Sequence, residues 1–325
     1  MPRMLRVGVV LIFLLLLGAS SVGGQEPSLP SDTTPEEAGQ LPDPASPLTD
    51  PVPIVAERHT SFAYGGGLLN WEADCAYQAD PSPVYIRRMP ETGGATQTLY
   101  EVGSPTVAQC SSVSQYNVAD DDGFFYANVA ENRLDARLSH DPATVVPLIT
   151  GLDMAQPVLA TDDDYLYVTR SGGIYRSAKD SLGATKINHA TGVNGLVVDE
   201  THIYWIDAAG LWRAEKTCIT PACWSDKEQL SAAEGDKHLN WTEEGDLLWV
   251  AQRLGGWSVM EYDSSLGVTS SLYWSSSDNT WNIGRPVRHD GCEYWLEDRD
   301  LNTPLNGFLR RNCGGTVASI ATGLT

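Results

Sequence analysis

Positive charge is scarce in this chain of 325 residues. Lysine and arginine together number 21 against 42 aspartate and glutamate residues, which gives a formal net charge of −21. The sequence contains no local cluster of basic residues that would offset this charge. Because phosphate backbones and anionic lipid surfaces bind to such clusters, we expect neither a nucleic acid nor a membrane surface as a partner.

Long hydrophobic runs are lacking beyond the N-terminus. Residues 1–24 combine Arg3 and Arg6 with an apolar run from Val7 to Leu17 and several small residues, which is the layout of a secretory signal peptide. The run is short for a transmembrane helix, so we expect cleavage, with an uncleaved N-terminal anchor as the alternative. Removing the two arginines would change the net charge from −21 to −23.

Aromatic residues are almost missing from residues 25–53, which are rich in proline, acidic residues, serine and threonine. This composition predicts a disordered linker. In the whole chain, by contrast, hydrophobic residues make up 42%, and tryptophan, tyrosine and phenylalanine number 10, 13 and 5. We therefore expect residues 54–325 to form a folded domain outside the cytoplasm, secreted or in the cell envelope, and to be a monomer.

An internal repeat organises residues 54–325. Its first marker is a short apolar or aromatic run, and five of the six copies follow an acidic turn such as Asp120–Asp122 or Asp162–Asp164. The steps between successive copies are 55, 42, 37, 44 and 46 residues. The copies are centred on Asn70, Phe125, Tyr167, Tyr204, Leu248 and Tyr294.

A second marker keeps the same step and usually ends in arginine, as in Ile174-Tyr175-Arg176 and Leu211-Trp212-Arg213, with weaker copies at Ala136-Arg137 and Val259-Met260-Glu261. Glycine turns separate the two markers, and a further β-rich run lies on either side, so each unit holds four short strands. No amphipathic helix of useful length interrupts them. The pattern predicts an all-β, six-bladed β-propeller with four antiparallel strands per blade. The tryptophans expected to pack between blades are Trp71, Trp205, Trp249 and Trp295.

One unit also carries a family resemblance. Ile203-Tyr204-Trp205-Ile206-Asp207, followed by Leu211-Trp212-Arg213, resembles the YWTD repeat of low-density-lipoprotein-receptor propellers. The whole of residues 54–325 is similar to YWTD-like six-bladed propellers of secreted bacterial proteins. Ile206 replaces the threonine of the family motif, and the other units depart further from it. The resemblance implies the fold and a role as a binding platform, but a fold does not fix a function.

Six cysteines behind a signal peptide indicate disulfides, and the sequence alone allows about 15 pairings. The blade pattern selects one of them. Cys292 and Cys313 would lie opposite each other in a hairpin of the last unit, and Cys218 and Cys223 would bracket a turn of the fourth. Cys75 and Cys110 lie in two loops that project from the same face, so they form the third expected pair.

Catalytic signatures are absent from the sequence. It contains no H-E-x-x-H, no G-x-S-x-G, no C-x-x-C and no phosphate-binding glycine loop. The acidic turns could hold calcium, which prefers clustered carboxylates, but their recurrence at one position of the repeat favours solvated turns. We therefore expect no catalytic residues and no cofactor, with calcium as the alternative.

Ligands of propellers usually bind where the first strand of each blade begins, at the mouth of the central channel. Polar residues at this position, taken from each unit, are the candidate ligand-binding residues. They are His59, Gln115, Gln156, Asn194, His238 and Arg285. The competing interpretation is that they only contact water.

Three functions are compatible with these observations. The first is a non-catalytic binding module for a protein, peptide or glycan ligand, favoured by the linker and by the lack of catalytic motifs. The second is a metal-dependent hydrolase or lactonase, as in gluconolactonase-like six-bladed propellers, although the candidate positions offer amides rather than carboxylate ligands. The third is a structural or assembly role in the cell envelope.

Overall fold

The computed structural model describes most of the chain from His59 to Leu324, and all its regular structure is β. Within this part, no helix is present that could cross a bilayer. The predicted signal peptide and linker lie outside the described residues. The described ranges are 59–65, 68–73, 84–90, 95, 97–102, 117–128, 131–152, 157–235, 237–242, 244–253, 255–276, 282–298 and 307–324.

The strands form six antiparallel sheets, each built from strands that are consecutive in the sequence. Blade 1 holds β1 (His59–Gly65), β2 (Leu68–Ala73), β3 (Val84–Pro90) and β4 (Gln97–Val102); blade 2 holds β5 (Asn117–Ala119), β6 (Gly123–Asn128), β7 (Arg133–Leu138) and β8 (Asp141–Thr150). Blade 3 holds β9 (Leu159–Thr161), β10 (Tyr165–Arg170), β11 (Gly173–Ala178) and β12 (Thr185–Asn188); blade 4 holds β13 (Gly195–Val198), β14 (His202–Asp207), β15 (Gly210–Glu215) and β16 (Glu228–Ser231).

The strands of each of the last two blades together contain more residues than the strands of any other blade. Blade 5 holds β17 (Lys237–Trp241), β18 (Leu247–Arg253), β19 (Gly256–Asp263) and β20 (Val268–Ser276). Blade 6 has an inner strand in two pieces, β21 (Asn282–Ile283) and β22 (Val287–His289), which both pair with β23 (Cys292–Asp298); β24 (Gly307–Cys313) and β25 (Thr316–Leu324) complete it.

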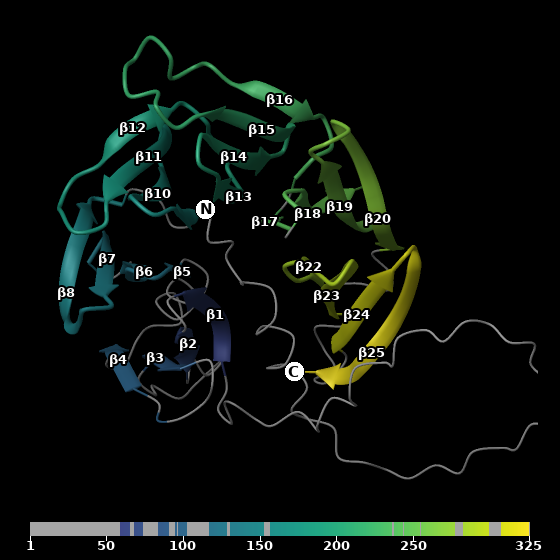
Figure 1. The fold of residues 1–325 in the computed structure, drawn as a ribbon, viewed down its shortest axis with the longest axis horizontal. Coiled ribbons are helices and arrows are strands. Elements are labelled where there is room, and N and C mark those ends of the chain that lie inside the picture. The colour runs from purple at the N-terminus through teal and green to yellow at the C-terminus, as the bar shows by residue number, and fades with distance from the viewer. Residues whose placement is uncertain are drawn as a thin grey trace, which may run out of the picture.

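Figure 1 shows the six sheets arranged around a common centre, with the colour passing round the ring from blade 1 to blade 6. The first strand of each blade lies innermost, and β1, β5, β9, β13 and β17 contact one another in that order. This arrangement confirms the predicted six-bladed β-propeller. Among the described strands no blade is completed by a strand from the other end of the chain, so blades 1 and 6 are each made of their own segment.

Glycine at the start of the third strand explains the predicted hairpin turns. Gly173 and Gly210 have positive φ angles of 155° and 139°, which favour glycine. A Cβ atom on either would lie 2.0 Å from a backbone oxygen of the fourth strand, at Asn188 or Ser231. Glycine at this position thus allows the hairpin turn and also lets the fourth strand approach the third. Both requirements explain why glycine occurs there in more than one blade.

Tryptophan side chains fill the space between neighbouring blades. Trp205, Trp249 and Trp295 are 0%, 0% and 1% exposed. Trp205 packs with residues of blades 3 and 4, Trp249 with residues of blades 4 and 5, and Trp295 with residues of blades 5 and 6. The predicted inter-blade role of these three is confirmed, whereas the side chain of Trp71 lies outside the described residues.

Two of the expected disulfides are present. Cys292 pairs with Cys313 across the β23–β24 hairpin, and Cys218 bonds to Cys223 between β15 and β16. Cys75 and Cys110 lie outside the described residues. Disulfides persist in oxidising compartments, which agrees with the expected location outside the cytoplasm.

The two bonds should differ in their effect on stability. Cys292 and Cys313 are separated by 21 residues, and Cys218 and Cys223 by 5. A longer closed loop restricts the unfolded chain more. Replacing Cys292 and Cys313 with alanine should therefore lower the free energy of unfolding by about 3 kcal/mol, and replacing Cys218 and Cys223 should lower it by about 2 kcal/mol. Urea titrations without reductant measure both, and the reverse order would contradict the prediction.

Candidate functional site

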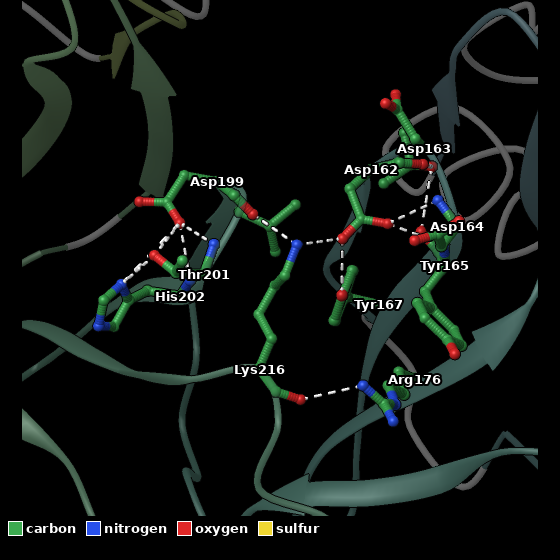
Figure 2. Close-up of polar contacts among 12 residues, drawn as sticks. Asp162, Asp163, Asp164, Tyr165, Tyr167, Arg176, Asp199, Thr201, His202 and Lys216 are labelled. Atoms are coloured by element: carbon green, nitrogen blue, oxygen red, sulfur yellow. Dashed lines mark hydrogen bonds and ion pairs between the residues drawn. The ribbon is translucent and has the colours of Figure 1, made fainter.

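The acidic turns join the first and second strands of the blades, and their leading aspartates shape the turns themselves. Oδ1 of Asp162 accepts hydrogen bonds from the backbone amides of Asp164 and Tyr165, at 3.0 and 2.8 Å. Asp199 accepts from the amides of Thr201 and His202 in the same way, as Figure 2 shows. The motif repeats because one carboxylate oxygen satisfies two amides that would otherwise lack partners.

The second oxygen of Asp162 binds a cation from the next blade, whereas that of Asp199 accepts from the Tyr204 hydroxyl of its own blade. Oδ2 of Asp162 accepts from the Tyr167 hydroxyl at 2.7 Å and from Lys216 Nζ at 2.5 Å. Lys216 follows β15 of blade 4 and also donates to the backbone oxygen of Asp199 (Figure 2). Burial alone would raise the pKa of Asp162, but these hydrogen bonds and those from two amides outweigh it and hold the pKa below its ordinary value.

Ion pairs between neighbouring blades also occur at other interfaces. Lys179 of blade 3 contacts Asp120 and Asp122 of blade 2 at 2.8 and 2.7 Å. Arg288 of blade 6 pairs with Asp246 and Glu261 of blade 5. The expectation of solvated turns is therefore wrong for Asp120 and Asp162, whose side chains are only 18% and 16% exposed. Their carboxylates join blades, and the described residues hold no group of three or more side chains placed to bind a metal ion.

The innermost strands have a different electrostatic character. No aspartate or glutamate occurs in β1, β5, β9, β13, β17, β21 or β22, although acidic residues outnumber basic ones two to one in the whole chain. Lys237, His238, Arg288 and His289 all lie on these strands. The described inner strands thus carry cationic but no anionic side chains, although Arg288 is already paired with Asp246, Glu261 and Glu293.

Two adjacent inner strands, those of blades 5 and 6, are interrupted. The register of β17 shifts between Lys237 and Asn240, and His238 has a positive φ of 63°. In blade 6 the residues Gly284–Pro286 separate β21 from β22, with Arg285 at their centre. Bulges of this kind redirect side chains out of the sheet, and strained residues concentrate at functional sites.

Hydrogen bonds across the blade boundary bring these residues together. Arg285 Nη2 donates to the backbone oxygen of Leu239 at 3.4 Å and to Asn240 Oδ1 at 3.3 Å. Asn240 Nδ2 in turn donates to the backbone oxygen of Pro286 at 3.3 Å. Arg285 is exposed to solvent, but the surrounding protein lowers its pKa by desolvation. Within the described chain it forms no ion pair.

His238 and Lys237 lie next to this arginine. Burial, together with the positive charges of Lys237 and Arg285, lowers the pKa of His238 to about 3, so its ring is neutral at pH 7. Lys237 Nζ lies over the Trp257 ring, 4.6 Å from its centroid. We call the group formed by Asn194, Lys237, His238, Asn240 and Arg285 the inner rim.

Three of the six predicted ligand-binding positions can be placed. Asn194 precedes β13 and donates through Nδ2 to the backbone oxygen of Gly235, 3.3 Å away, in the connection that leads to β17. His238 and Arg285 are brought together as described. Gln115 and Gln156 lie outside the described residues, and His59 begins β1, but its side chain is not described. Lys237 and Asn240 belong to the group although the sequence did not single them out.

Two hollows lie elsewhere on the protein. One of about 490 Å³ is lined by Arg288, Glu293 and Asn312, among others, and its arginine already has carboxylate partners. The other, of about 410 Å³, lies beside the Cys218–Cys223 disulfide. Neither contains a residue of the inner rim, and charge pairing in the first leaves little for a ligand to complete. The inner rim is therefore the stronger candidate site.

Comparisons with known proteins support the fold. No protein-family model and no curated protein matches the chain. Among solved structures, it is similar to oligogalacturonate lyase from Vibrio parahaemolyticus, with a TM-score of 0.56 and 11% identity over 83% of this chain and 80% of that one. An oligogalacturonate lyase in complex with manganese gives 0.54 and 13%, over 81% and 78% of the two chains.

A third similar structure is described as the extracellular domain of a hybrid two-component system from B. thetaiotaomicron. It gives a TM-score of 0.50 and 12% identity, and the match covers 82% of this chain and 33% of that one. Sequence identities this low support a shared fold but do not support a shared activity. The resemblance to YWTD propellers is supported only at the level of the β-propeller fold, and this fold is what the chain shares with its structural neighbours.

Proposed function

We propose that this chain is an extracytoplasmic binding module that takes a protein, peptide or glycan ligand at the inner rim and releases it chemically unchanged. The proposal rests on one observation above all. Two neighbouring inner strands are both interrupted, and the interruptions bring His238 and Arg285 to the same place. A guanidinium that has no carboxylate partner among the described residues, in a protein of net charge −21, is available to a ligand.

The disulfides support a location outside the cytoplasm, and the absence of catalytic motifs supports binding without chemistry. Polar side chains presented on a rigid scaffold are also the usual composition of a ligand site. A role in envelope assembly would be one form of this proposal, with an envelope protein as the ligand.

The test is a comparison of variants on peptide and glycan arrays. Residues 54–325 with Arg285→Ala should lose the ligands that the unchanged protein binds, because the arginine contacts them. Arg311→Ala is the matched control, since Arg311 is an exposed arginine of the same blade, on β24. An identical set of bound ligands for all three proteins would contradict the proposal.

A second readout separates binding from catalysis. Each ligand recovered after incubation with the protein should keep its mass in mass spectrometry. A product of changed mass that depends on added metal would favour the hydrolase alternative instead.

A further inference from the structure

We propose that the inner rim binds a carboxylate group of the ligand, held by the guanidinium of Arg285 and an N–H of His238. This inference rests on the proposed function and adds the chemical class of the ligand. Three features of the inner rim, all taken from the described residues, lead to it: the lack of acidic residues on the inner strands, the unused donors of Arg285 and the unpaired, neutral ring of His238.

Charge is the first feature. The described inner strands lack acidic residues altogether, and Lys237 and Arg285 place two positive charges beside His238. Protein walls of low dielectric strengthen the field of a local positive group. These two positive charges attract an anion to the inner rim.

The donors of Arg285 are the second feature. Its guanidinium has five N–H groups, and within the described chain only Nη2 makes hydrogen bonds, at 3.3 and 3.4 Å. Both distances are longer than the usual 2.7–3.2 Å, so these bonds are weak. Nε and Nη1 have no partner among the described residues. A planar carboxylate matches the fork of an arginine through two parallel hydrogen bonds.

His238 supplies the third feature. Its ring makes no hydrogen bond within the described chain, although its backbone is held in a conformation that few residues other than glycine adopt. The ring is neutral because its pKa lies at about 3. A neutral imidazole has one N–H donor and adds no charge, so the rim offers a few donors rather than a dense cluster of cations.

This donor set fits a carboxylate better than a phosphate. A phosphate dianion is usually held by a helix N-terminus or by a loop of successive backbone amides. The described residues contain no helix, and no glycine-rich phosphate loop occurs in the sequence. A carboxylate carries a single charge and needs fewer donors, which Arg285 and His238 provide.

The experiment measures binding of two carboxylated probes by isothermal titration calorimetry. One is a hexaglutamate peptide, compared with hexaglutamine, and the other is a polyuronate oligosaccharide, compared with its methyl ester. At least one carboxylated probe should bind, its neutral counterpart should not, and the pair that responds identifies the source of the carboxylate. Inorganic phosphate is included as a competitor and should compete only weakly.

Variants then assign the contact. Arg285→Ala should weaken binding about 10- to 100-fold, the range expected for a charge-assisted hydrogen bond. Arg285→Lys keeps the charge but not the fork and should restore binding only in part. His238→Asn tolerates the same backbone conformation and should weaken binding less than Arg285→Ala. Arg311→Ala should bind like the unchanged protein, and the thermal midpoints of all variants verify that they are folded.

The outcomes separate this inference from the proposed function. If array ligands depend on Arg285 but are neutral, or if phosphate binds more tightly than both carboxylated probes, the carboxylate assignment is wrong and the binding module stands. If neither carboxylated probe binds, the carboxylate assignment is likewise wrong. If no ligand of either experiment depends on Arg285, both proposals are overturned.

Discussion

Replacing Arg310 with methionine should lower the free energy of unfolding by about 3–5 kcal/mol, because it leaves a buried carboxylate without its counter-ion. The carboxylate belongs to Glu297, which is 0% exposed. Arg310 Nε donates to it at 2.6 Å, and the hydroxyl of Tyr273, on β20 of blade 5, donates to it at 2.9 Å. The loss would therefore affect both blade 6 and its interface with blade 5. Urea unfolding followed by tryptophan fluorescence measures it.

A double variant tests the explanation. When Glu297→Met is added to Arg310→Met, the buried charge is removed together with its partner, and much of the lost stability should return. Arg213→Met is the matched control, since Arg213 pairs at 2.7 Å with a Glu228 side chain that is 59% exposed. Exposed pairs contribute about 0–1 kcal/mol. If Arg310→Met and Arg213→Met cost the same, burial of Glu297 is not the cause.

Replacing Trp205 with alanine should also cost about 3–5 kcal/mol, through the cavity that it opens between blades 3 and 4. Trp205 is fully buried and packs with Tyr167, Ile174 and Leu196, which come from both blades. Rigid strands on either side limit how far the space can collapse, so most of the cavity should persist. The same urea titration measures the loss.

Two controls accompany this variant. Trp205→Phe should lose much less, because an aromatic ring still fills the interface and the indole nitrogen of Trp205 has no hydrogen-bond partner among the described residues. Trp274→Ala removes the same type of side chain from a position that is 55% exposed, and should cost little. An effect of Trp274→Ala as large as that of Trp205→Ala would refute the packing argument.

Much of the fold could be predicted from the sequence because it depends on local patterns. The apolar or aromatic run recurs with each blade and the arginine marker with every blade except the fifth, and they correspond to the second and third strands in the structure. Cys292 and Cys313 could be paired because an antiparallel hairpin fixes which residues lie opposite each other. Each of these predictions needs only the neighbouring residues of one blade.

Contacts between blades were harder to predict. The acidic turns were interpreted as solvated, but Lys216 reaches Asp162 from a position 54 residues later in the chain. Nothing in the sequence near either residue indicates that contact. The lysine follows the third strand of one blade, and only the packing of the blades places it beside the turn of the previous one.

The candidate site was likewise predictable only in part. The repeat gives the position of His238 near the start of an inner strand, whereas Arg285 lies in the break between the two pieces of the inner strand of blade 6. Their proximity could not be predicted, because no cluster of basic residues exists in the sequence near either of them and the fold alone assembles one. The bulges that redirect them break the strand pattern in two blades, and no rule of alternation anticipates a break.

The construction of each blade from one continuous segment has a consequence for folding. Every strand pairing in the described chain joins strands that are close in sequence, so contact order is low and little entropy is lost in closing each loop. A blade can form its sheet soon after its residues are synthesised, and each new blade packs on the previous one. Blade 6 is made last, so the interface in which its Trp295 packs on blade 5 is completed only when the whole chain is available.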